Sequence, residues 1–451
     1  MKSSRQIVYD ALYRVCCEGG YSNLSLDQAI TESKLDKGQA AFVSALFYGV
    51  LESGIQMDWA IQKYLKKPLS SLDREIQIIL RMGFYQLVFL NSVPDSAAVD
   101  ESVRLAAYAR KTSAKAFVNA VLRSFLRDKK KIVLPDAAKD PLTYLSIRYS
   151  CPKWILSLWE EQYGQETAEK LAEASLGRPP LTVRVNPLKT TPEKLVGYLE
   201  NRGVRASVHP WMENCLLLEE TGGIDRLPQY KQGLFHVQDL SSQICACALE
   251  AQPGERLLDI CSAPGSKSFT AAQSMENQGE ILAFDLYEHK VKLIAEGAKR
   301  LGITIIHPAV GDGTVFDPEM PQADRVLCDV PCSGLGIIRR KPEIKYKSPE
   351  TLEGLPEIQK RILQNASRYV KPGGRLIYST CTLNRAENEA VISEFLSQNV
   401  SFKPLQLSKL FSKIEFRVFS GEIGTTLFPH ELGGDGFYIA VMEKENEFSG
   451  V

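Results

Sequence analysis

Hydrophobic residues recur at every third or fourth position through the first part of the chain, which is the spacing of helices that bury one face. Ile7, Val8, Leu12 and Val15 fall on one such face, and the same spacing continues to about residue 127. No alternating strand pattern interrupts it. The pattern predicts an all-helical domain over residues 1–135.

The pattern becomes mixed between residues 136 and 235. Small and charged residues from 136 to 141 are typical of a linker. Helix-like and then strand-like segments follow, at 152–163, 166–174, 181–186 and 215–218. This order predicts a small α+β module and not a continuation of the helical domain.

Beyond residue 236 the chain alternates short apolar runs with helix-like segments. The apolar runs predict strands at about 256–261, 280–286, 304–310, 323–330 and 373–380. Strands and helices in alternation predict a doubly wound, Rossmann-like α/β domain over residues 236–451. A last apolar run, 437–441, is expected to close one edge of its sheet.

Polar and reactive residues follow the ends of these predicted strands. They are Cys261, Ser262, Ala263, Pro264, Gly265, Ser266 and Lys267 after the first strand, Asp285 at the end of the second, Asp312 after the third, Asp329 and Cys332 at and after the fourth, and Cys381 after the fifth. The carboxyl ends of parallel strands meet at one edge, where open α/β sheets bind ligands. The sequence therefore predicts a single site at this edge.

The first loop narrows the choice of cofactor. It lacks the glycines of a dinucleotide-binding turn and the leading glycine of a phosphate-binding loop, so both classes are disfavoured. Asp285 stands where an acid meets ribose hydroxyls, about twenty residues after the loop. S-adenosylmethionine needs a close loop, a ribose acceptor and a polar partner for adenine near Asp312, so it is the predicted cofactor at Cys261–Lys267, Asp285, Asp312 and Asp329.

The charge balance and the cysteine spacing do not identify a function, but they argue against several classes of protein. The 54 basic residues balance the 54 acidic ones, so net charge gives no argument for a polyanionic partner. No apolar run reaches the roughly 18 residues that span a bilayer, and no signal-peptide core is visible. The cysteines and histidines show no metal-site spacing. We expect a cytoplasmic protein with reduced thiols, no metal and no membrane contact, acting as a monomer.

Two resemblances extend this interpretation. Segments 5–12, 36–50 and 98–123 resemble the helical RNA-binding domain of NusB-type antitermination factors, which implies RNA contact without catalysis. One basic cluster ends this domain: Arg123, Arg127, Lys129, Lys130 and Lys131. The sequence leaves open whether these residues contact phosphates or form a solvated helix end.

The second resemblance covers the catalytic part. Six short segments look like the signature set of RNA cytosine-5 methyltransferases: 259–268, 329–336, 339–345, 379–382, 387–389 and 434–438. Together with the NusB-like start, the chain resembles the RsmB (Sun/Fmu) branch, which modifies a cytosine of 16S ribosomal RNA. The family loop usually reads Ala-Pro-Gly-Gly-Lys-Thr; Ser266 and Ser268 depart from it here, which puts cofactor affinity in doubt.

The resemblance implies roles for three residues. Carbon 5 of cytosine becomes nucleophilic only after a thiolate adds to carbon 6. By analogy with the RNA enzymes, Cys381 supplies that thiolate, Cys332 assists product release, and Asp329 holds the cytosine ring. Spacing alone does not choose between the cysteines, because Cys332 follows a proline as in the DNA enzymes.

Other functions are weighed against this one. A non-catalytic RNA-binding ribosome assembly factor would not need both cysteines and Asp329, and a cytosine-5 methyltransferase could act on another RNA. The basic residues Arg339, Arg340, Lys341, Lys345 and Lys347 follow Cys332, and we interpret them as phosphate contacts for the substrate.

Overall fold

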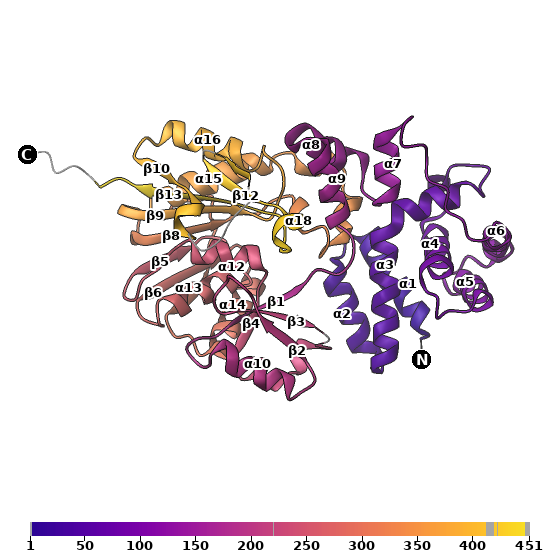
Figure 1. Ribbon diagram of the computed structural model, residues 1–451, viewed down its shortest axis with the longest axis horizontal. Helices are drawn as coiled ribbons and strands as arrows, with labels where there is room; N and C mark the ends of the chain where they lie inside the picture. Colours follow the sequence, from indigo (N-terminus) through magenta and orange to yellow (C-terminus); the bar gives the residue numbers. More distant parts are fainter. Residues whose placement is uncertain (1, 220, 412–418, 422, 447–451) are drawn as a thin grey trace, which may run out of the picture. The chain divides into compact units, whose positions relative to one another are not determined.

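The structure is a computed structural model that describes residues 2–219, 221–411, 419–421 and 423–446. The chain divides into two compact units (Figure 1). Unit 1 comprises Met1–Arg178 together with Ile338–Pro349, and unit 2 comprises Pro179–Ile337 and Glu350–Val451. The three-domain boundaries predicted from the sequence remain a prediction. The two compact units have other boundaries, because unit 1 extends to Arg178 and includes Ile338–Pro349.

Unit 1 is helical throughout its described residues, which confirms the predicted all-helical start. Its α-helices are α1 Ser4–Glu18, α2 Ser22–Ser33, α3 Lys37–Gln62, α4 Arg74–Phe89, α5 Asp95–Tyr108, α6 Lys115–Arg127, α7 Pro141–Arg148, α8 Lys153–Tyr163 and α9 Gln165–Ala174. Polar side chains fix where helices begin: Ser3 caps α1 in a reciprocal pair with Gln6, and Asp36 caps α3 with Gln39. Helices α8 and α9, which were predicted as part of the α+β module, belong to this unit, and so does α7, which was not predicted.

Helix α3 is long and apolar enough to cross a membrane, by length and composition alone. Half of its most apolar stretch is buried inside the protein, and Val43, Leu46, Phe47 and Val50 lie in the core of unit 1. The described residues contain no second helix of this kind. The composition of α3 is accounted for by its place as a core helix.

The segment Ile338–Pro349 belongs to unit 1 although the sequence around it builds unit 2. The Tyr346 hydroxyl donates a hydrogen bond to the carbonyl oxygen of Leu51 at 2.8 Å. The backbone N–H of Ser22 donates to the Glu343 carboxylate at 3.1 Å. These contacts bind the segment to α2 and α3.

Unit 2 contains a small antiparallel sheet and a large mixed one. The small sheet has the order β2-β3-β1-β4, with β1 Leu181–Val185, β2 Arg205–Val208, β3 Cys215–Glu219 and β4 Phe235–Val237, and α10 Pro192–Glu200 packs beside it. Strands β1 and β3 were predicted. Strands β2 and β4 were not, because they are short and lack a continuous apolar run.

The large sheet has the order β11-β12-β13-β9-β8-β5-β6-β7, with β10 paired to β13. Its strands are β5 Arg256–Asp259, β6 Glu280–Asp285, β7 Ile306–Val310, β8 Ala323–Asp329, β9 Val370–Thr380, β10 Phe402–Leu405, β11 Phe419–Gly421, β12 Gly424–Leu427 and β13 Phe437–Lys444. Strands β5 to β9 pair with one another in parallel, which confirms all five predicted strands of the doubly wound core.

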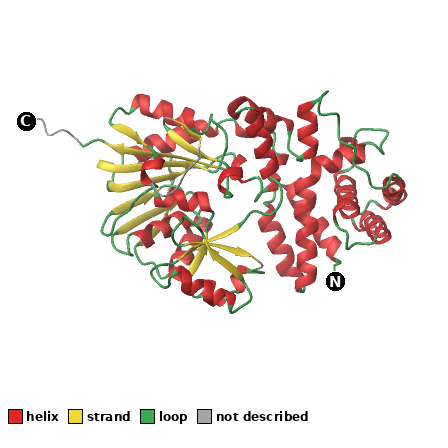
Figure 2. Ribbon diagram, in the orientation of Figure 1, coloured by secondary structure: helices red, strands yellow, loops and turns green. Residues whose placement is uncertain are grey.

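Helices cover both faces of this sheet (Figure 2). Leu257 lies on the sheet face that is covered by α12 Leu240–Cys247, α13 Ser266–Ser274 and α14 Glu288–Leu301. Its neighbour Leu258 packs with the opposite face, against α15 Leu355–Ser367 and α16 Glu389–Gln398. Because successive strand residues point to opposite faces, a strand buried on both sides is apolar at consecutive positions.

The prediction that residues 437–441 close one edge of the sheet is wrong. Strand β13 pairs with β9 on one side and with β12 and β10 on the other. The short strands β10, β11 and β12 extend the sheet beyond it. An apolar run identifies a buried strand but contains no information about its neighbours.

Candidate active site at the carboxyl ends of the parallel strands

The strand order reverses between β5 and β8, because the chain winds outward from β5 to β7 and returns to place β8 on the other side of β5. Loops that leave the two strands in opposite directions open a crevice at such a reversal, where α/β proteins bind ligands. The loop Cys261–Gly265 follows β5, and the loop with Cys332 follows β8. The predicted site residues therefore meet at the position that topology favours.

The two candidate cysteines lie side by side. The Cys332 and Cys381 sulfur atoms are 3.3 Å apart, and both are free, half-buried thiols. They meet because β8 and β9 are adjacent and parallel, with Asp329 level with Ser379 in the register. The sequence placed both residues after strands, and the pairing of those strands brings them into contact.

The two thiols differ in their electrostatic surroundings. The hydrogen bond with Cys381 and burial together raise the pKa of Cys332 well above the ordinary thiol value. The negative charges of Glu387 and Asp329 act in the same direction. Cys332 therefore holds its proton, and a proton on Cys332 is available to stabilise a thiolate at Cys381.

Glu387 holds the two cysteine loops together and was missed as a site residue. Its fully buried carboxylate accepts hydrogen bonds from the Ser333 backbone N–H at 2.9 Å and from the Ser333 hydroxyl at 2.5 Å. The side-chain amides of Gln359 and Asn384 donate to it at 2.9 Å each. The Ser333 hydroxyl also lies 2.7 Å from the hydroxyl of Thr382. One carboxylate thus ties the residues that follow each cysteine.

The backbones of these loops also touch. Gly336 donates its N–H to the carbonyl oxygen of Cys381 at 3.0 Å, and Gly436 donates to the carbonyl oxygen of Gly336 at 2.9 Å. A Cβ atom at Gly336 would lie 2.0 Å from the backbone carbonyl oxygen of Gly436, so a side chain cannot be accommodated at position 336. Glycine at 336 allows the close approach that brings the Cys332 loop to Cys381.

Asp329 and Lys267 form a buried ion pair beside the cysteines, with the amine 2.5 Å from Oδ2. Burial opposes the lysine charge, but the Asp329 carboxylate outweighs this effect and raises the pKa of Lys267. The other carboxylate oxygen accepts a hydrogen bond from the Ser379 hydroxyl at 2.8 Å. Both predicted residues thus lie at the same edge as the cysteine pair.

The loop after β5 turns sharply into α13. Gly265 has φ +102°, and a Cβ atom there would lie 2.6 Å from the Phe269 ring, so the turn requires glycine. Ser268 donates to the fully buried Asp259 carboxylate at 2.6 Å and lies 2.9 Å from the Ser262 hydroxyl. Serine at 268 thus supplies the hydroxyl that the usual threonine carries.

Asp285 keeps one carboxylate oxygen available. Its Oδ1 accepts from the Tyr287 backbone N–H at 3.2 Å and lies 3.6 Å from the Lys290 amine, while Oδ2 has no hydrogen bond within the described part of the chain. Leu286 and Val310 lie next to it and are about half exposed, at 52% and 56%. Exposed apolar side chains beside a free acceptor fit a nucleoside, and sequence reasoning did not single them out.

The Asp312 carboxylate accepts hydrogen bonds within the turn that it begins. Its Oδ1 accepts from the Thr314 hydroxyl at 2.7 Å and from the Thr314 backbone N–H at 2.9 Å, and these bonds lower the pKa of Asp312. Its side chain is otherwise exposed. Its predicted contact with adenine stays a prediction.

The basic segment after Cys332 differs from the prediction at Lys345. Its amine lies 3.4 Å from the carbonyl oxygens of Glu52 and Tyr149, and its side chain is buried in unit 1. Lys345 is therefore a structural residue of unit 1, and its assignment as a phosphate contact is wrong. The amine of Lys341 lies over the ring of Tyr21, 5.6 Å from its centroid.

Metal chemistry has no candidate in this part of the structure. Across the described residues, no group of three or more His, Cys, Asp or Glu side chains is arranged to hold a metal ion.

Three known protein families match successive parts of the chain. Residues 2–127 match the NusB family, residues 151–225 match the ferredoxin-like domain of RsmF/B-like methyltransferases, and residues 246–443 match the 16S rRNA methyltransferase RsmB/F family. The order of the three matches agrees with the predicted succession of helical, α+β and α/β parts.

Similar proteins cover the chain from end to end. A probable ribosomal RNA small subunit methyltransferase B from Bacillus subtilis is 38% identical over 98% of this chain and 99% of its own length. The ribosomal RNA small subunit methyltransferase B of Pectobacterium carotovorum is 31% identical over 98% of this chain and 100% of its own length.

Solved structures share the fold. The crystal structure of PH0851 superposes with a TM-score of 0.83 at 24% identity, covering 98% of this chain and 99% of that one. A methyltransferase homologue from Pyrococcus horikoshii has a TM-score of 0.59 at 27% identity, covering 67% of this chain and 99% of its own. NSun6 from the same organism, solved with SFG, has a TM-score of 0.57 at 22% identity, covering 66% and 99%.

Proposed function

Because the chain belongs to the RsmB family of ribosomal RNA small subunit methyltransferases, we propose that it methylates carbon 5 of a cytosine in 16S ribosomal RNA through a covalent cysteine adduct. The family uses S-adenosylmethionine to methylate ribosomal RNA. The observation that carries the finer proposal is the 3.3 Å separation of the Cys332 and Cys381 sulfur atoms beside Asp329. A non-catalytic assembly factor would have no need of this arrangement.

The residues at the sheet edge fit S-adenosylmethionine. Asp285 offers Oδ2 to ribose hydroxyls, the half-exposed Leu286 and Val310 offer apolar contact to adenine, and the turn at Gly265 brings backbone close to the ligand. Leaving a buried ribose hydroxyl unpaired costs about 1–3 kcal/mol, so Asp285→Ala should weaken cofactor binding by about that amount, which calorimetry can measure. When bound, this cofactor supplies the methyl group.

We assign attack on the base to Cys381. The pKa of Cys332 is raised, so this thiol keeps its proton and can donate it to the sulfur of Cys381, 3.3 Å away. The Cys381 thiolate adds to carbon 6 of cytosine, and the electron pair of the ring double bond moves to carbon 5, which then accepts the methyl group. Asp329, held by Lys267 and Ser379, is the acceptor for the cytosine amino group.

Product release reverses the addition. A base removes the proton from carbon 5, the ring double bond forms again, and the carbon 6 to sulfur bond breaks to return the Cys381 thiolate. Cys332 lies beside that sulfur. Once its thiol has lost its proton to solvent, the resulting thiolate accepts the proton of carbon 5, and its raised pKa makes it a strong base. We therefore assign release to Cys332.

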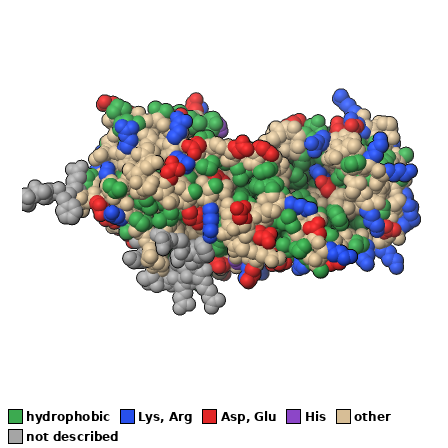
Figure 3. Space-filling model, turned by 90° about the horizontal axis from the view of Figure 1, so that it is seen from above, with side chains coloured by type: hydrophobic (Ala, Val, Ile, Leu, Met, Phe, Trp, Pro, Cys, Tyr) green, Lys and Arg blue, Asp and Glu red, His purple; other side chains and the backbone are tan. Residues whose placement is uncertain are grey.

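RNA contact is proposed for the helical unit. Lys and Arg side chains gather at the end of this unit that carries α5 and α6 (Figure 3). Arg123, Arg127, Lys129 and Lys131 are exposed there, so their cationic groups are accessible, and we propose that they contact RNA phosphates. The target base must leave its stack to reach the thiols, so we expect an unpaired or flipped cytosine. We further propose a monomeric enzyme of the cytoplasm.

The test separates the two cysteines by the adduct that each variant leaves. Cys381→Ala removes the attacking thiolate, so neither adduct nor methylated product should form above background. Cys332→Ala permits attack and methyl transfer but slows release, so protein should stay attached to methylated RNA. A denaturing gel with radiolabelled 16S RNA and cofactor detects the attached protein as a retarded band.

The wild-type protein and the double variant serve as controls for this gel. Wild type should release its product, and the double variant should form no band. A band with Cys381→Ala that disappears with Cys332→Ala would reverse the two roles. If bisulfite mapping of 16S RNA found no new methylcytosine with the wild-type protein, the proposed reaction itself would be wrong.

A further inference from the structure

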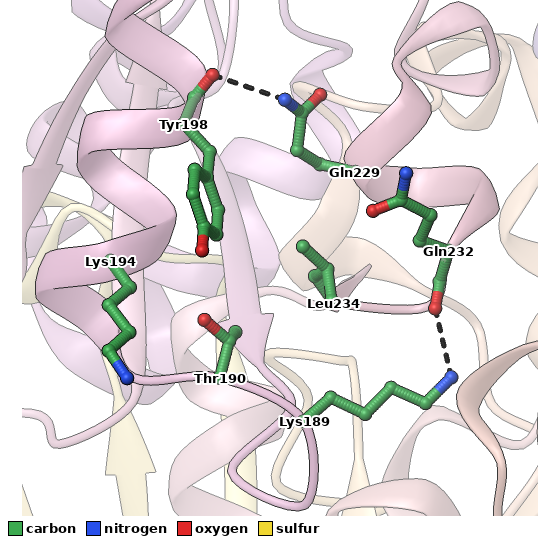
Figure 4. A pocket seen from close by; sticks show the side chains of 7 residues that line it. All are labelled: Lys189, Thr190, Lys194, Tyr198, Gln229, Gln232 and Leu234. Atoms are coloured by element: carbon green, nitrogen blue, oxygen red, sulfur yellow. Dashed lines mark hydrogen bonds between the residues drawn. The ribbon is translucent and has the colours of Figure 1, made fainter.

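Hydrogen bonds join the small antiparallel module to the rest of unit 2. One set lies at the C-terminal end of α14, where the side-chain amide of Asn186 donates to the carbonyl oxygen of Leu301 at 2.9 Å. The Lys189 amine donates to the carbonyl oxygens of Arg300 at 3.1 Å and Gln232 at 2.9 Å, and Figure 4 shows the second of these bonds. Helix α14 ends just before β7 begins, so this set lies at the amino edge of the parallel strands.

A second set starts at Gln238, which follows β4 and reaches α13, the helix that begins directly after the proposed cofactor loop, Cys261–Gly265. Its Oε1 accepts from the Thr270 hydroxyl at 2.7 Å, and its amide nitrogen donates to the Ser266 carbonyl oxygen at 3.2 Å. Its backbone is fixed as well, because its carbonyl oxygen accepts from the Thr182 hydroxyl at 2.8 Å. Gln238 is 3% exposed. One buried glutamine therefore connects strand β1 of the small sheet with the start of α13.

His236 supports this connection from within β4. Burial lowers the pKa of His236 to about 3, so its ring is neutral near pH 7. A neutral imidazole has one N–H, and here it donates from Nε2 to Gln238 Oε1 at 3.2 Å. The ring also meets the Phe269 ring edge-on, with 5.7 Å between centroids. Phe269 packs against the turn at Gly265, where a Cβ atom would lie 2.6 Å from that ring. Strand β4 thus supports the turn through a hydrogen bond and an aromatic contact.

These contacts hold the part of the fold that is proposed to bind the cofactor. The carbonyl oxygen that Gln238 contacts belongs to Ser266, the first residue of α13. Lys267, whose amine pairs with Asp329, follows it directly. A loop that is already held in its bound position loses little conformational freedom when the ligand binds, whereas a loose loop must be ordered at a cost in free energy. Residues that fix this turn therefore affect affinity without touching the ligand.

The next residues of the same segment contact a different loop. The buried Ser241 hydroxyl donates to the Asp435 carbonyl oxygen at 2.7 Å. Asp435 precedes Gly436, whose backbone contacts the loop that follows Cys332. Gln238 and Ser241 are thus three residues apart but contact separate parts of the site, so their effects can be compared.

We propose that Gln238 is a positioning residue for the cofactor loop, and that the small module sets the affinity for S-adenosylmethionine through it. This inference rests on the proposed function. Gln238 holds the first residue of α13 by its carbonyl oxygen and the next turn by the Thr270 hydroxyl, and it takes no part in methyl transfer itself.

Calorimetric titration of the full-length protein with S-adenosylmethionine tests this role. Gln238→Met keeps the length of the side chain but removes both bonds, so the Kd should rise about 5- to 50-fold, the range for one or two lost hydrogen bonds. Thr270→Val should also raise the Kd, whereas Thr270→Ser keeps the hydroxyl and should bind like wild type. Because the two residues share a bond, their effects in the double variant should be less than additive.

Two buried residues provide matched controls. Asn186→Leu breaks the bond of the same module at the amino edge, so it should lower the free energy of unfolding but leave the Kd unchanged. Ser241→Ala breaks the bond to the other loop and should also leave the Kd unchanged. Steady-state kinetics add a second measurement: in Gln238→Met the KM for the cofactor should rise while kcat stays near the wild-type value, because only binding is weakened.

An unchanged Kd in both Gln238→Met and Thr270→Val would overturn the proposal. An equal rise in Kd for Asn186→Leu would also overturn it, because any loosening of the module would then have the same effect. Denaturant unfolding verifies that each variant is folded. Should Gln238→Met fail to fold, the Thr270 pair decides, and equal Kd values for Thr270→Val and Thr270→Ser would refute the role of Gln238.

Wild-type measurements keep this role separate from the proposed function. If the wild-type protein does not bind S-adenosylmethionine, or if bisulfite mapping finds no methylcytosine, the proposed function is refuted. If the wild-type protein binds the cofactor and the variants bind it equally well, only the role of Gln238 is refuted.

Discussion

At the scale of single residues, Glu387 connects three segments of the site through hydrogen bonds to its carboxylate. Four donors converge on its carboxylate, from the loop after Cys332, from the loop after Cys381 and from α15. A carboxylate accepts all four, but the amide of glutamine would direct its own N–H groups at two of them. The charge of Glu387 is therefore needed for alignment, although it does not touch the reacting base.

We predict that Glu387→Gln lowers the free energy of unfolding by about 2–4 kcal/mol, since it leaves buried donors unpaired. The rate of adduct formation should fall with it, because the two loops lose their common anchor. Denaturant unfolding and the denaturing gel measure the two effects. Glu255→Gln is the control, since the partly buried Glu255 carboxylate accepts from Arg325 at 3.0 and 2.9 Å near the amino ends of β5 and β8, away from both cysteine loops. Equal effects from both substitutions would contradict a specific role for Glu387.

Asp259 predicts a pH dependence of stability. Burial, opposed by the Ser268 hydroxyl and aided by the charge of Asp329, raises the pKa of Asp259 from 3.8 to about 6. The folded protein thus binds this proton more tightly than the unfolded chain. Protonated Asp259 therefore adds roughly 3 kcal/mol to the free energy of unfolding below about pH 4. This contribution is lost as the pH rises to about 6.

Asp259→Asn lacks this titration, so its stability relative to wild type should increase between about pH 4 and pH 6 and stay constant above that. Asparagine keeps an oxygen for the Ser268 hydroxyl to donate to. Denaturant unfolding of both proteins across this range checks the prediction. Parallel pH profiles would show that the carboxylate is not the titrating group.

At the scale of elements, the segment Ile338–Pro349 joins the catalytic sequence to the helical unit. Tyr346 carries the contact: its hydroxyl bonds to Leu51 on α3, and a Cβ atom at Gly54 would lie 2.0 Å from that hydroxyl oxygen. Glycine in the interior of a helix costs about 1 kcal/mol relative to alanine. The position of Tyr346 accounts for the glycine.

We therefore predict that Gly54→Ala destabilises wild type by displacing Tyr346, but stabilises a Tyr346→Ala protein by up to about 1 kcal/mol. The change of sign follows because the second background removes the clash and leaves only the helix preference. Thermal unfolding of the four proteins of this cycle measures the coupling. Additive effects would mean that Tyr346 and Gly54 do not contact each other.

At the scale of the whole molecule, the chain passes between the two units three times, after Arg178, after Ile337 and after Pro349. The last two passages flank the segment that follows the Cys332 loop. Removing the helices therefore removes more than a surface for RNA, because it also strips Tyr346 and Lys345 of their partners on α3.

Deletion of the residues before Pro141 should leave S-adenosylmethionine binding nearly unchanged, because the residues proposed to hold the cofactor lie in unit 2. RNA affinity should fall, and adduct formation at saturating RNA should fall further, since the Cys332 loop loses its distal anchor. Calorimetry, anisotropy and the denaturing gel separate the three quantities. Unaltered methylation by the truncated protein would require another role for the helices.

The sequence alone determined the elements and the residues at their ends. Hydrophobic spacing is local, and it was sufficient for the helical part up to about residue 127, for the five parallel strands and for the position of each cysteine after a strand. The loop at Gly265 could also be predicted, because its glycine and small residues are required by the turn itself.

Only the tertiary structure decided which elements are neighbours. The pairing of β8 with β9 brings the two thiols to 3.3 Å, and the strands beyond β13 move it from the edge into the sheet. The burial of Lys345 and the four donors on Glu387 likewise depend on residues distant in sequence. Periodicity records which face of an element is buried, but it does not record what that face is buried against.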